Sequence, residues 1–485
     1  MLFFYQGAGV AADIALLTNV VLLFGVLSAF GAVLTLPGIA GLVLTLGMAV
    51  DANVIIYERI KEELKAGKGL SKAVADGYRN AYSAIIDGQV TTLLTGIVLF
   101  FFGSGPIKGF ATTLIIGIIT SVFTSIFVTR LIFEGRIKRG KNITFENELT
   151  KNFLKNTHIN FLDARKWSYI ISGALIVIAL GSMFLKGFTY GVDFTGGRTY
   201  VVRFDQPVTA EDVREAVNKT FNLADPESSV EVKQFGGDSQ MKITTSYKFK
   251  DESSTEDAEI ENMLYESLKG FYLEPGTFAD FTSTLENPNG IISSDKVGAT
   301  IANDIKRNAI ISIILALIVI FAYIAMRFKG WNWGLGGVVS LAHTAIIIIG
   351  FFSLFSGILP FNLDVDQTFI AAILTIIGYA INDNVVIFDR IRENLSLHPN
   401  DDFKDTINKS LNATLTRTVN TSVSTLLPML AIAIFGGESI RGLSVALCLG
   451  VLIGTYASIM IGTPVMYDAE MAARKKAAAK APVKK

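Results

Sequence analysis

The chain has 485 residues, of which 51% are hydrophobic and 18% are charged, and its formal net charge is zero. A composition this apolar argues against a soluble protein, and the balanced charge gives no reason to expect a nucleic-acid partner. The single cysteine, Cys448, excludes an intrachain disulfide and a cysteine-cluster metal site. The three histidines are scattered and no nucleotide-binding loop is present, so we expect no cofactor, no metal and no enzymatic activity.

Long apolar runs recur at the length that a helix needs to cross a bilayer, about 20 residues. They predict about ten membrane-spanning helices, near residues 13–33, 39–58, 85–102, 109–130, 168–186, 307–326, 333–356, 366–389, 415–435 and 440–466. The residues before position 13 include a glycine cluster and are too few to cross.

The distribution of basic residues predicts the orientation of these spans. Segments 58–79, 130–166 and 390–417 and the C-terminal tail are rich in Lys and Arg, whereas the short loops on the other side carry little charge. The positive-inside rule therefore places the basic segments in the cytoplasm, and the chain is expected in the cell inner membrane. Residues 187–306 then lie outside, in the periplasm or the extracellular space.

The outward segment, residues 187–306, has the composition of a small folded domain. It predicts a strand at 198–204, a helix at 209–221, strands at 229–234 and 241–247, a helix at 255–271 and a weaker last strand. This order is typical of a ferredoxin-like α+β domain.

Two stretches about 330 residues apart are nearly identical. Gly47–Leu64 aligns without a gap on Gly378–Leu395, and the match continues with 85–94 over 418–427 and 103–110 over 436–443. Both copies run in the same direction, which predicts a parallel repeat and two pseudo-symmetric membrane halves.

The repeat and the spans together predict the domain organisation. We expect a four-span half at 1–133, a cytoplasmic linker at 134–167, a span at 168–186, the soluble domain at 187–306, a five-span half at 307–468 and a basic tail at 469–485. The second half has two spans and a soluble domain that the first half lacks. If the duplication was complete, the chain is a truncated or separately encoded piece of a longer protein.

Each repeat places an acid inside an apolar span. Asp51 and Asp383 lie several residues inside the bilayer exit, and Asp51 is about two helical turns from Arg59. An ionised side chain near mid-bilayer costs about 2.5–3.5 kcal/mol, which favours a protonatable functional site over a solvated acid near the headgroups. Asp51 aligns with Asn382, so the two acids are offset by one residue and the pseudo-symmetry is broken there.

Arg417 begins a polar stripe on one face of the next predicted helix. Asn420 and Ser424 follow at helical spacing, and Pro428 predicts a kink. Arg417 opposite Asp383 would hold that carboxylate ionised. A snorkelling arginine at the membrane boundary fits the spacing equally well, so both interpretations remain open.

Four other polar residues support the predicted site less directly. Asn382 and Asn384 flank the second acid, and Asp87 and Thr91 share a face in the first half. Asp87 is as compatible with a helix cap near the headgroups as with a relay. His343 stands in an apolar run and is expected to be a hydrogen-bonded packing residue.

Several of these segments resemble the SecD and SecF protein-export membrane proteins of the resistance–nodulation–division superfamily. Residues 36–64 and 102–130 resemble the C-terminal membrane half of SecD, and residues 190–204, 297–305, 324–330 and 378–394 resemble SecF. Both parts on one chain resemble the fused SecDF form.

The resemblance implies an accessory subunit of the Sec translocase that uses the proton motive force to complete polypeptide export. It implies as partners the Sec channel and its associated insertase subunits, the translocating polypeptide, the lipid bilayer and a missing N-terminal part of SecD. Carried over to this sequence, the proton relay falls on Asp51, Asp383 and Arg417.

The sequence departs from the family pattern in three places. The SecD half lacks the Asn expected after Asp87, Thr344 follows His343 where SecF often has Asp, and the large outward domain of SecD is missing. We therefore do not expect this chain alone to perform a full cycle. The alternatives are a proton-driven exporter of small molecules or lipids from the same superfamily, and a membrane scaffold that conducts nothing.

Overall fold

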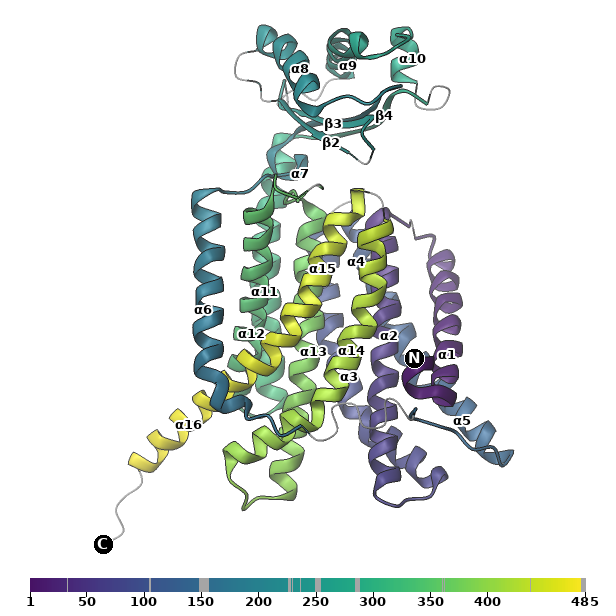
Figure 1. Cartoon of the computed structure of the whole chain (residues 1–485), viewed down its shortest axis with the longest axis vertical. Coiled ribbons are helices and arrows are strands. Elements are labelled where there is room, and N and C mark those ends of the chain that lie inside the picture. The colour runs from purple at the N-terminus through teal and green to yellow at the C-terminus, as the bar shows by residue number, and fades with distance from the viewer. Residues whose placement is uncertain are drawn as a thin grey trace.

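The structure is a computed structural model that describes residues 1–32, 34–103, 106–147, 157–225, 228, 230–235, 237–248, 254–283, 288–359, 361, 363–436 and 438–480. Within these residues, ten helices are long and apolar enough to cross a membrane. They form an upright bundle with a small α+β domain at one end (Figure 1). We call this end of the bundle the domain end and the opposite end the loop end.

The membrane helices follow the predicted order. They are α1 (Leu2–Ala29), α2 (Leu36–Lys65), α3 (Leu70–Phe102), α4 (Pro106–Phe123), α6 (Phe161–Leu185), α11 (Ala299–Arg327), α12 (Trp331–Phe355), α13 (Gln367–Leu397), α14 (Phe403–Phe435) and α15 (Glu438–Ala457). The prediction of ten membrane helices in a polytopic protein is confirmed.

The start of the first helix was predicted wrongly. Helix α1 begins at Leu2 instead of residue 13, with a backbone break at Gln6 (φ 44°, ψ −114°). The preceding turn is held in place because Tyr5 is buried and the Ala8 N–H donates to the Thr144 carbonyl at 3.0 Å. Gly7 allows this approach, since a Cβ there would lie 2.9 Å from the Thr144 hydroxyl.

Other helices are longer than their apolar runs. Helix α6 begins at Phe161, before the predicted residue 168, and α16 (Thr463–Lys480) continues into the tail because alanine and lysine favour helix. Parts of the predicted linker (148–156) and tail (481–485) lie outside the described residues. Pro428 lies within the continuous helix α14.

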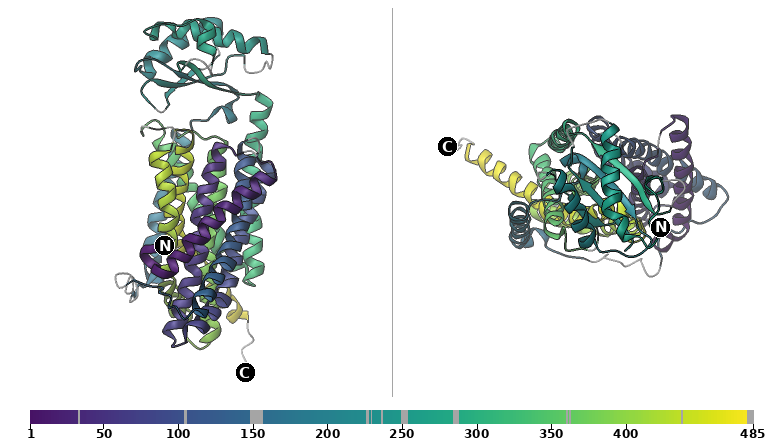
Figure 2. Two further views of the ribbon diagram at one scale, coloured as in Figure 1. Left: turned by 90° about the vertical axis from the view of Figure 1, so that its right-hand side faces the viewer. Right: turned by 90° about the horizontal axis from the view of Figure 1, so that it is seen from above.

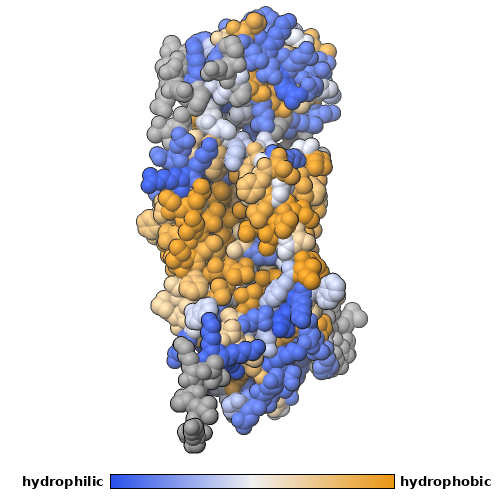
Figure 3. Space-filling model, turned by 90° about the vertical axis from the view of Figure 1, so that its left-hand side faces the viewer, coloured by the Kyte–Doolittle hydropathy of each residue, from blue (hydrophilic) through white to orange (hydrophobic). Residues whose placement is uncertain are grey.

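The side surface of the bundle is a hydrophobic belt between two hydrophilic ends (Figure 3). Peripheral helices supply this surface: only 22% of the apolar window of α6 and 28% of that of α11 are buried. The corresponding fractions are 89% for α13 and 78% for α2. The two helices that carry the predicted acids are therefore the centre of the bundle.

The internal repeat is visible in the helix order. Helices α1 to α4 correspond to α12 to α15, and both fourth helices continue through a π-helical turn, η1 (Thr124–Val128) and η3 (Ser458–Gly462). Helix α4 then runs into α5 (Thr129–Lys138) as α15 runs into α16. The two turns lie at matching places in the two halves, which supports duplication.

Paired glycines bring the two halves together at the seam. A Cβ on Gly47 of α2 would meet Thr425 of α14 at 3.3 Å, and a Cβ on Gly378 of α13 would meet the Thr95 hydroxyl of α3 at 2.1 Å. The Thr92 hydroxyl donates to the Gly378 carbonyl at 2.9 Å. Each half therefore docks its acid-bearing helix onto the third helix of the other half through a small residue, as membrane helices commonly do.

The soluble domain is a four-stranded antiparallel sheet in the order β2-β3-β1-β4. Its strands are β1 (Gly197–Arg203), β2 (Val230–Gln234), β3 (Gln240–Thr245) and β4 (Gly290–Val297). Helices α8 (Ala210–Ala224) and α9 (Ser254–Leu268) cover the face away from the bundle (Figures 1 and 2). The predicted ferredoxin-like order is confirmed.

Three connections join the soluble domain to the bundle. Helix α6 leads into it, α11 follows directly from β4, and the loop before α13 pairs with the segment before β1. In that pairing the Val365 N–H donates to the Thr189 carbonyl at 2.8 Å and the Gly191 N–H donates to the Val365 carbonyl at 3.0 Å. A movement of α11 or α13 therefore reaches the domain without a flexible linker.

We predict that Gly378→Val lowers the unfolding free energy by about 1–3 kcal/mol, because the added side chain overpacks the contact with Thr95. The matched control is Gly173→Val in α6, where a Cβ meets nothing within 4 Å. Thermal unfolding in detergent measures both variants. Equal midpoints for the two would contradict close packing at the seam.

A second prediction concerns a buried arginine in the soluble domain. Arg198 is 2% exposed and its Nε donates to Asp257 at 2.6 Å. Partial burial opposes ionisation of Asp257, but hydrogen bonds from Arg198 and Lys296 outweigh it and lower the pKa of this carboxyl. The stabilisation is therefore present above the unfolded pKa, about 4, and is lost as pH falls through the lower folded value.

We expect Asp257→Asn to cost about 2 kcal/mol at pH 7 and to flatten the loss of stability as pH falls below about 4. Glu266→Gln, in the exposed pair with Lys269, is the control and should leave both unchanged. Thermal unfolding of the domain across this pH range is the measurement. An unchanged acid limb in Asp257→Asn would exclude the pair as its cause.

Candidate functional site

The first acid, Asp51, lies at the seam between the two halves. It is 3% exposed, and its Oδ2 accepts a hydrogen bond from the Asn382 amide of α13 at 2.5 Å. Its Oδ1 has no hydrogen-bond partner within the described part of the chain. Asn382 is itself tightly placed, since a Cβ on Gly88 of α3 would lie 1.9 Å from its amide oxygen. Asp51 is thus a buried carboxyl group that one amide of the opposite half holds.

The second acid, Asp383, follows Asn382 on α13 and points elsewhere. It is half-buried and lies beside Thr455 of α15, whose hydroxyl contacts the Ser422 hydroxyl at 2.6 Å. Successive residues on a helix are rotated by about 100°, so Asn382 and Asp383 face different neighbours. The one-residue offset seen in the alignment therefore places an amide, and not a second acid, directly against Asp51.

Arg417 of α14 is the cation of the site. It lies close enough to interact electrostatically with both Asp51 and Asp383, but it forms no ion pair of 4.0 Å or less with either acid, and all three residues are described. Its Nε lacks a hydrogen-bond partner within the described segments. The sequence left open whether Arg417 snorkels or faces the acids. The structure places it half-buried between the acids and the loop end.

Two hydrogen-bonded connections extend the site. Tyr379 donates to Thr425 at 3.1 Å and ties α13 to α14. Asn420 donates to the Tyr5 hydroxyl at 3.4 Å, and Tyr5 donates to Glu58 at 2.9 Å. The second connection runs from α14 through α1 to the loop end of α2. The sequence placed Glu58 in the repeated motif and on the same helix face as Asp51, but it gave no role in the site to Glu58 or to Tyr5.

Asp87 forms a separate polar cluster. It is 5% exposed, and its carboxylate accepts hydrogen bonds from the Arg327 Nε at 2.8 Å and from the Tyr323 hydroxyl at 3.0 Å. Asp87 lies in the middle of α3, so it does not cap that helix. Arg327 and Tyr323 belong to α11, about 240 residues away in the sequence, and only the tertiary structure reveals them as partners.

The other predicted supporting residues lie outside the acid cluster. Asn384 faces α12 and donates to the Ser340 hydroxyl at 3.3 Å, while Thr91 and Ser424 donate to carbonyls of their own helices. His343 was expected to be hydrogen-bonded, which is wrong: both ring nitrogens lack a partner in the described structure. It is buried against Tyr456 instead, with ring centroids 6.1 Å apart.

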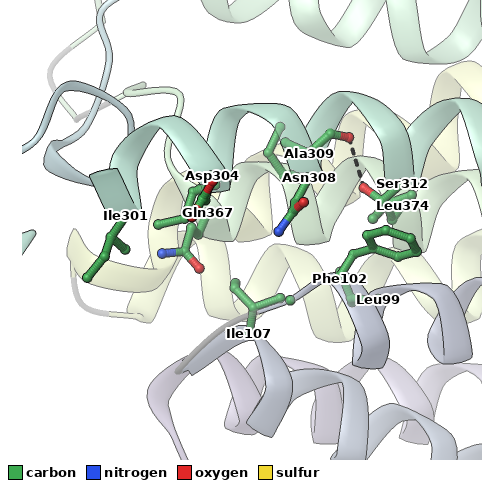
Figure 4. A pocket seen from close by; sticks show the side chains of 13 residues that line it. Leu99, Phe102, Ile107, Ile301, Asp304, Asn308, Ala309, Ser312, Gln367 and Leu374 are labelled. Carbon is green, nitrogen blue, oxygen red and sulfur yellow. Dashed lines mark hydrogen bonds between the residues drawn. The ribbon is translucent and has the colours of Figure 1, made fainter. Parts of the chain in front are cut away.

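Cavities approach the acid layer from both ends. At the domain end a pocket of about 150 Å³ lies between α3, α4, α11 and α13, and Asp304, Asn308 and Gln367 contribute polar groups to it (Figure 4). Leu374, which lines it, precedes Asn382 by two helical turns, about 12 Å. At the loop end a cavity of about 40 Å³ is bounded by Arg417.

These features define a class: a polytopic membrane protein built from two repeated halves, with buried acids where the halves meet. A family model described as "Protein export membrane protein SecD/SecF, C-terminal" matches residues 1–136 and 278–472. A second, described as "SecD/SecF GG Motif", matches residues 181–208. The chain belongs to the SecD/SecF family of protein-export membrane proteins.

Known relatives agree over nearly the whole chain. It is 35% identical over 466 residues to protein translocase subunit SecDF of Brucella abortus biovar 1, covering 96% of this chain and 58% of that protein. It is 34% identical over 492 residues to SecDF of Bacillus subtilis, covering 96% and 61%. The crystal structure of Thermus thermophilus SecDF, a translocon-associated membrane protein, matches with a TM-score of 0.82 and 33% identity over 97% of this chain and 60% of that one. The chain spans about 60% of the length of these relatives.

We predict that Arg327→Met lowers the unfolding free energy by about 3 kcal/mol, because it leaves the Asp87 carboxylate buried without its cation. The double variant Arg327→Met/Asp87→Leu should recover most of this loss. Arg130→Met, in the exposed pair with Glu134, is the control. Thermal unfolding in detergent measures the cycle. A double variant no more stable than Arg327→Met would argue against direct pairing.

Proposed function

We propose that the chain is the membrane motor part of an accessory subunit of the Sec translocase, which uses the proton motive force to complete polypeptide export. The observation that carries the proposal is one arginine facing two carboxyl groups at the seam of the two halves, one buried and one half-buried. Membership of the SecD/SecF family and similarity to relatives named translocase subunits support the substrate class, an exported polypeptide.

The charge count of the site supports one proton per cycle. With Arg417 charged and both Asp51 and Asp383 ionised, the layer carries one uncompensated negative charge inside the helix bundle, which is costly. One proton on either carboxylate makes the layer neutral. Arg417 pairs directly with neither acid in this structure, so it can move toward whichever carboxylate is ionised.

One helix of the site, α13, is also connected to the soluble domain. Helix α13 contacts α11 and begins at the loop that pairs with the segment before β1. A potential of 100 mV supplies about 2.3 kcal/mol for each charge moved across the membrane. This shifts a two-state helix packing roughly fiftyfold, at 1.4 kcal/mol per factor of ten. Protonation at the seam would thereby move the domain relative to the bundle.

The orientation and partners belong to the same proposal. The basic loop end faces the cytoplasm, and the soluble domain lies in the periplasm or outside the cell, where the exported chain emerges. The partners are the Sec channel, its associated insertase subunits and the polypeptide in transit. The membrane is the cytoplasmic (inner) membrane.

We expect Asp51→Asn and Asp383→Asn to abolish proton-dependent export while leaving folding and membrane insertion intact. Arg417→Lys should be milder than Arg417→Met, since Lys keeps the charge and loses only the planar fork. Asp163→Asn, in an exposed pair with Lys404, is the control for a lost carboxylate.

The measurement is late-stage export in vesicles that contain the channel and an N-terminal SecD part supplied by a relative, with and without an imposed proton gradient. If both Asn variants responded to the gradient as the parent does, the chain would act as a scaffold and not as a motor.

A further inference from the structure

Four charged side chains close the loop end of the seam. They come from the two central helices, and we call them the charge ring: Arg59 and Glu62 on α2, and Arg390 and Glu393 on α13. Two ion pairs cross between the halves, Arg59 to Glu393 at 2.9 Å and Arg390 to Glu62 at 3.2 Å. One more lies within each helix, Arg59 to Glu62 at 2.9 Å in α2 and Arg390 to Glu393 at 3.0 Å in α13.

The ring is symmetric, unlike the acid layer above it. Arg59 aligns with Arg390 in the repeat, and Glu62 aligns with Glu393. Each arginine therefore holds one glutamate of its own helix and the equivalent glutamate of the other. An isolated surface ion pair contributes little to stability, but in this closed network of four residues each charged side chain has two oppositely charged partners. The arginine side chains are only 16% and 20% exposed.

The ring lies between solvent and the acid site. The loop-end cavity is lined by Arg59, Glu62 and Arg390 on its outer side and by Arg417 on its inner side. Buried Ala84 and Ile55 contribute to its wall. The ring residues and Arg417 therefore border the same cavity.

We propose that the charge ring is a gate, which closes this cavity when its inter-half pairs are formed and admits water to Arg417 when they separate. The arrangement suits a reversible gate because of its in-helix pairs. When the halves separate, each arginine loses its partner across the seam but keeps the glutamate three residues further along its own helix. Opening therefore leaves no charge unpaired, which would otherwise be costly.

This inference deepens the proposed function, because the gate would control release of the proton to the cytoplasm. Access to the cavity is nevertheless a property that can be measured without a gradient or a substrate. Loss of proton-driven export and loss of the gate are thus separable results.

The test labels a cysteine in the cavity wall with a membrane-impermeant maleimide. The parent for this experiment is the full chain with Cys448, the buried single cysteine, replaced by Ala and with Ala84→Cys added. We expect slow labelling in this parent and a rate at least tenfold higher when Glu62→Gln and Glu393→Gln are added together. Ile55→Cys provides a second cavity probe if Ala84→Cys disturbs the fold.

Reversing all four charges of the ring tests whether slow labelling depends on the ion pairs themselves or on which side chain stands at each position. The quadruple variant Arg59→Glu/Glu62→Arg/Arg390→Glu/Glu393→Arg reforms every pair with opposite polarity and should restore slow labelling. Glu134→Gln, which breaks an exposed pair away from the ring, should leave the rate unchanged.

A probe at the other end of the seam guards against general unfolding. Leu374→Cys, 1% exposed at the domain-end pocket, should remain protected in the Glu62→Gln/Glu393→Gln background. The gate is overturned if the paired Gln variants label as slowly as the parent, if the reversed ring labels as fast as the Gln variants, or if Leu374→Cys becomes reactive together with Ala84→Cys.

Discussion

The organisation of the bundle depends on one buried contact, the hydrogen bond from Asn382 to Asp51. A carboxylate inside a membrane bundle is tolerated only where protein groups replace the water it has lost. Here the replacement comes from the opposite half, so the acid is satisfied only while the two halves are docked. Glycines at the same seam, Gly88 and Gly378, bring the helices close enough for an amide to reach. The close packing of the helices and the hydrogen bond to the buried acid therefore depend on each other.

The two layers of the seam use the repeat differently. At the loop end, the pair Arg59–Glu393 has its equivalent in the pair Arg390–Glu62, so the charge ring keeps the symmetry of the repeat. In the acid layer a one-residue offset sets Asn382 against Asp51 and turns Asp383 toward α15. A symmetric layer would place two carboxylates face to face. The offset instead gives two carboxylates in different surroundings, both close enough to one arginine to interact with it, an arrangement with more than one favourable charge state.

Helix α11 connects the soluble domain to both halves. It starts at the end of β4 and terminates at Arg327, whose guanidinium binds Asp87 in the opposite half. Asp87 precedes Gly88, the residue against which Asn382 packs. The sheet domain, the Asp87 cluster and the Asp51 contact are thus linked through α11 and α3 by rigid helices and short hydrogen bonds. Such a path suits mechanical coupling because helices transmit displacement with little deformation.

The sequence alone determined the local features of this protein. Ten spans, the order of the sheet domain, the repeat and the burial of Asp51 follow from hydropathy, strand and helix patterns, and alignment of two motifs, all of which are properties of contiguous residues. The offset between Asp51 and Asp383 was also readable, because it is a matter of register. The start of α1 was predicted wrongly, since a contact with Thr144 holds the first turn, and several other helices, including α6, extend beyond their apolar runs.

The tertiary structure decided which helices meet. The sequence singled out Asp87 and Asn384 as polar residues within apolar helices. It did not indicate that Asp87 contacts Arg327 or that Asn384 contacts Ser340. It left open whether Arg417 snorkels at the membrane boundary or faces Asp383, and it did not indicate that Arg417 faces two acids without pairing to either. The motif letters contained both arginines and both glutamates of the charge ring, yet nothing in them indicates that each pair crosses the seam. Helical periodicity fixes the direction of a side chain within its own helix, whereas its partner depends on how distant helices pack.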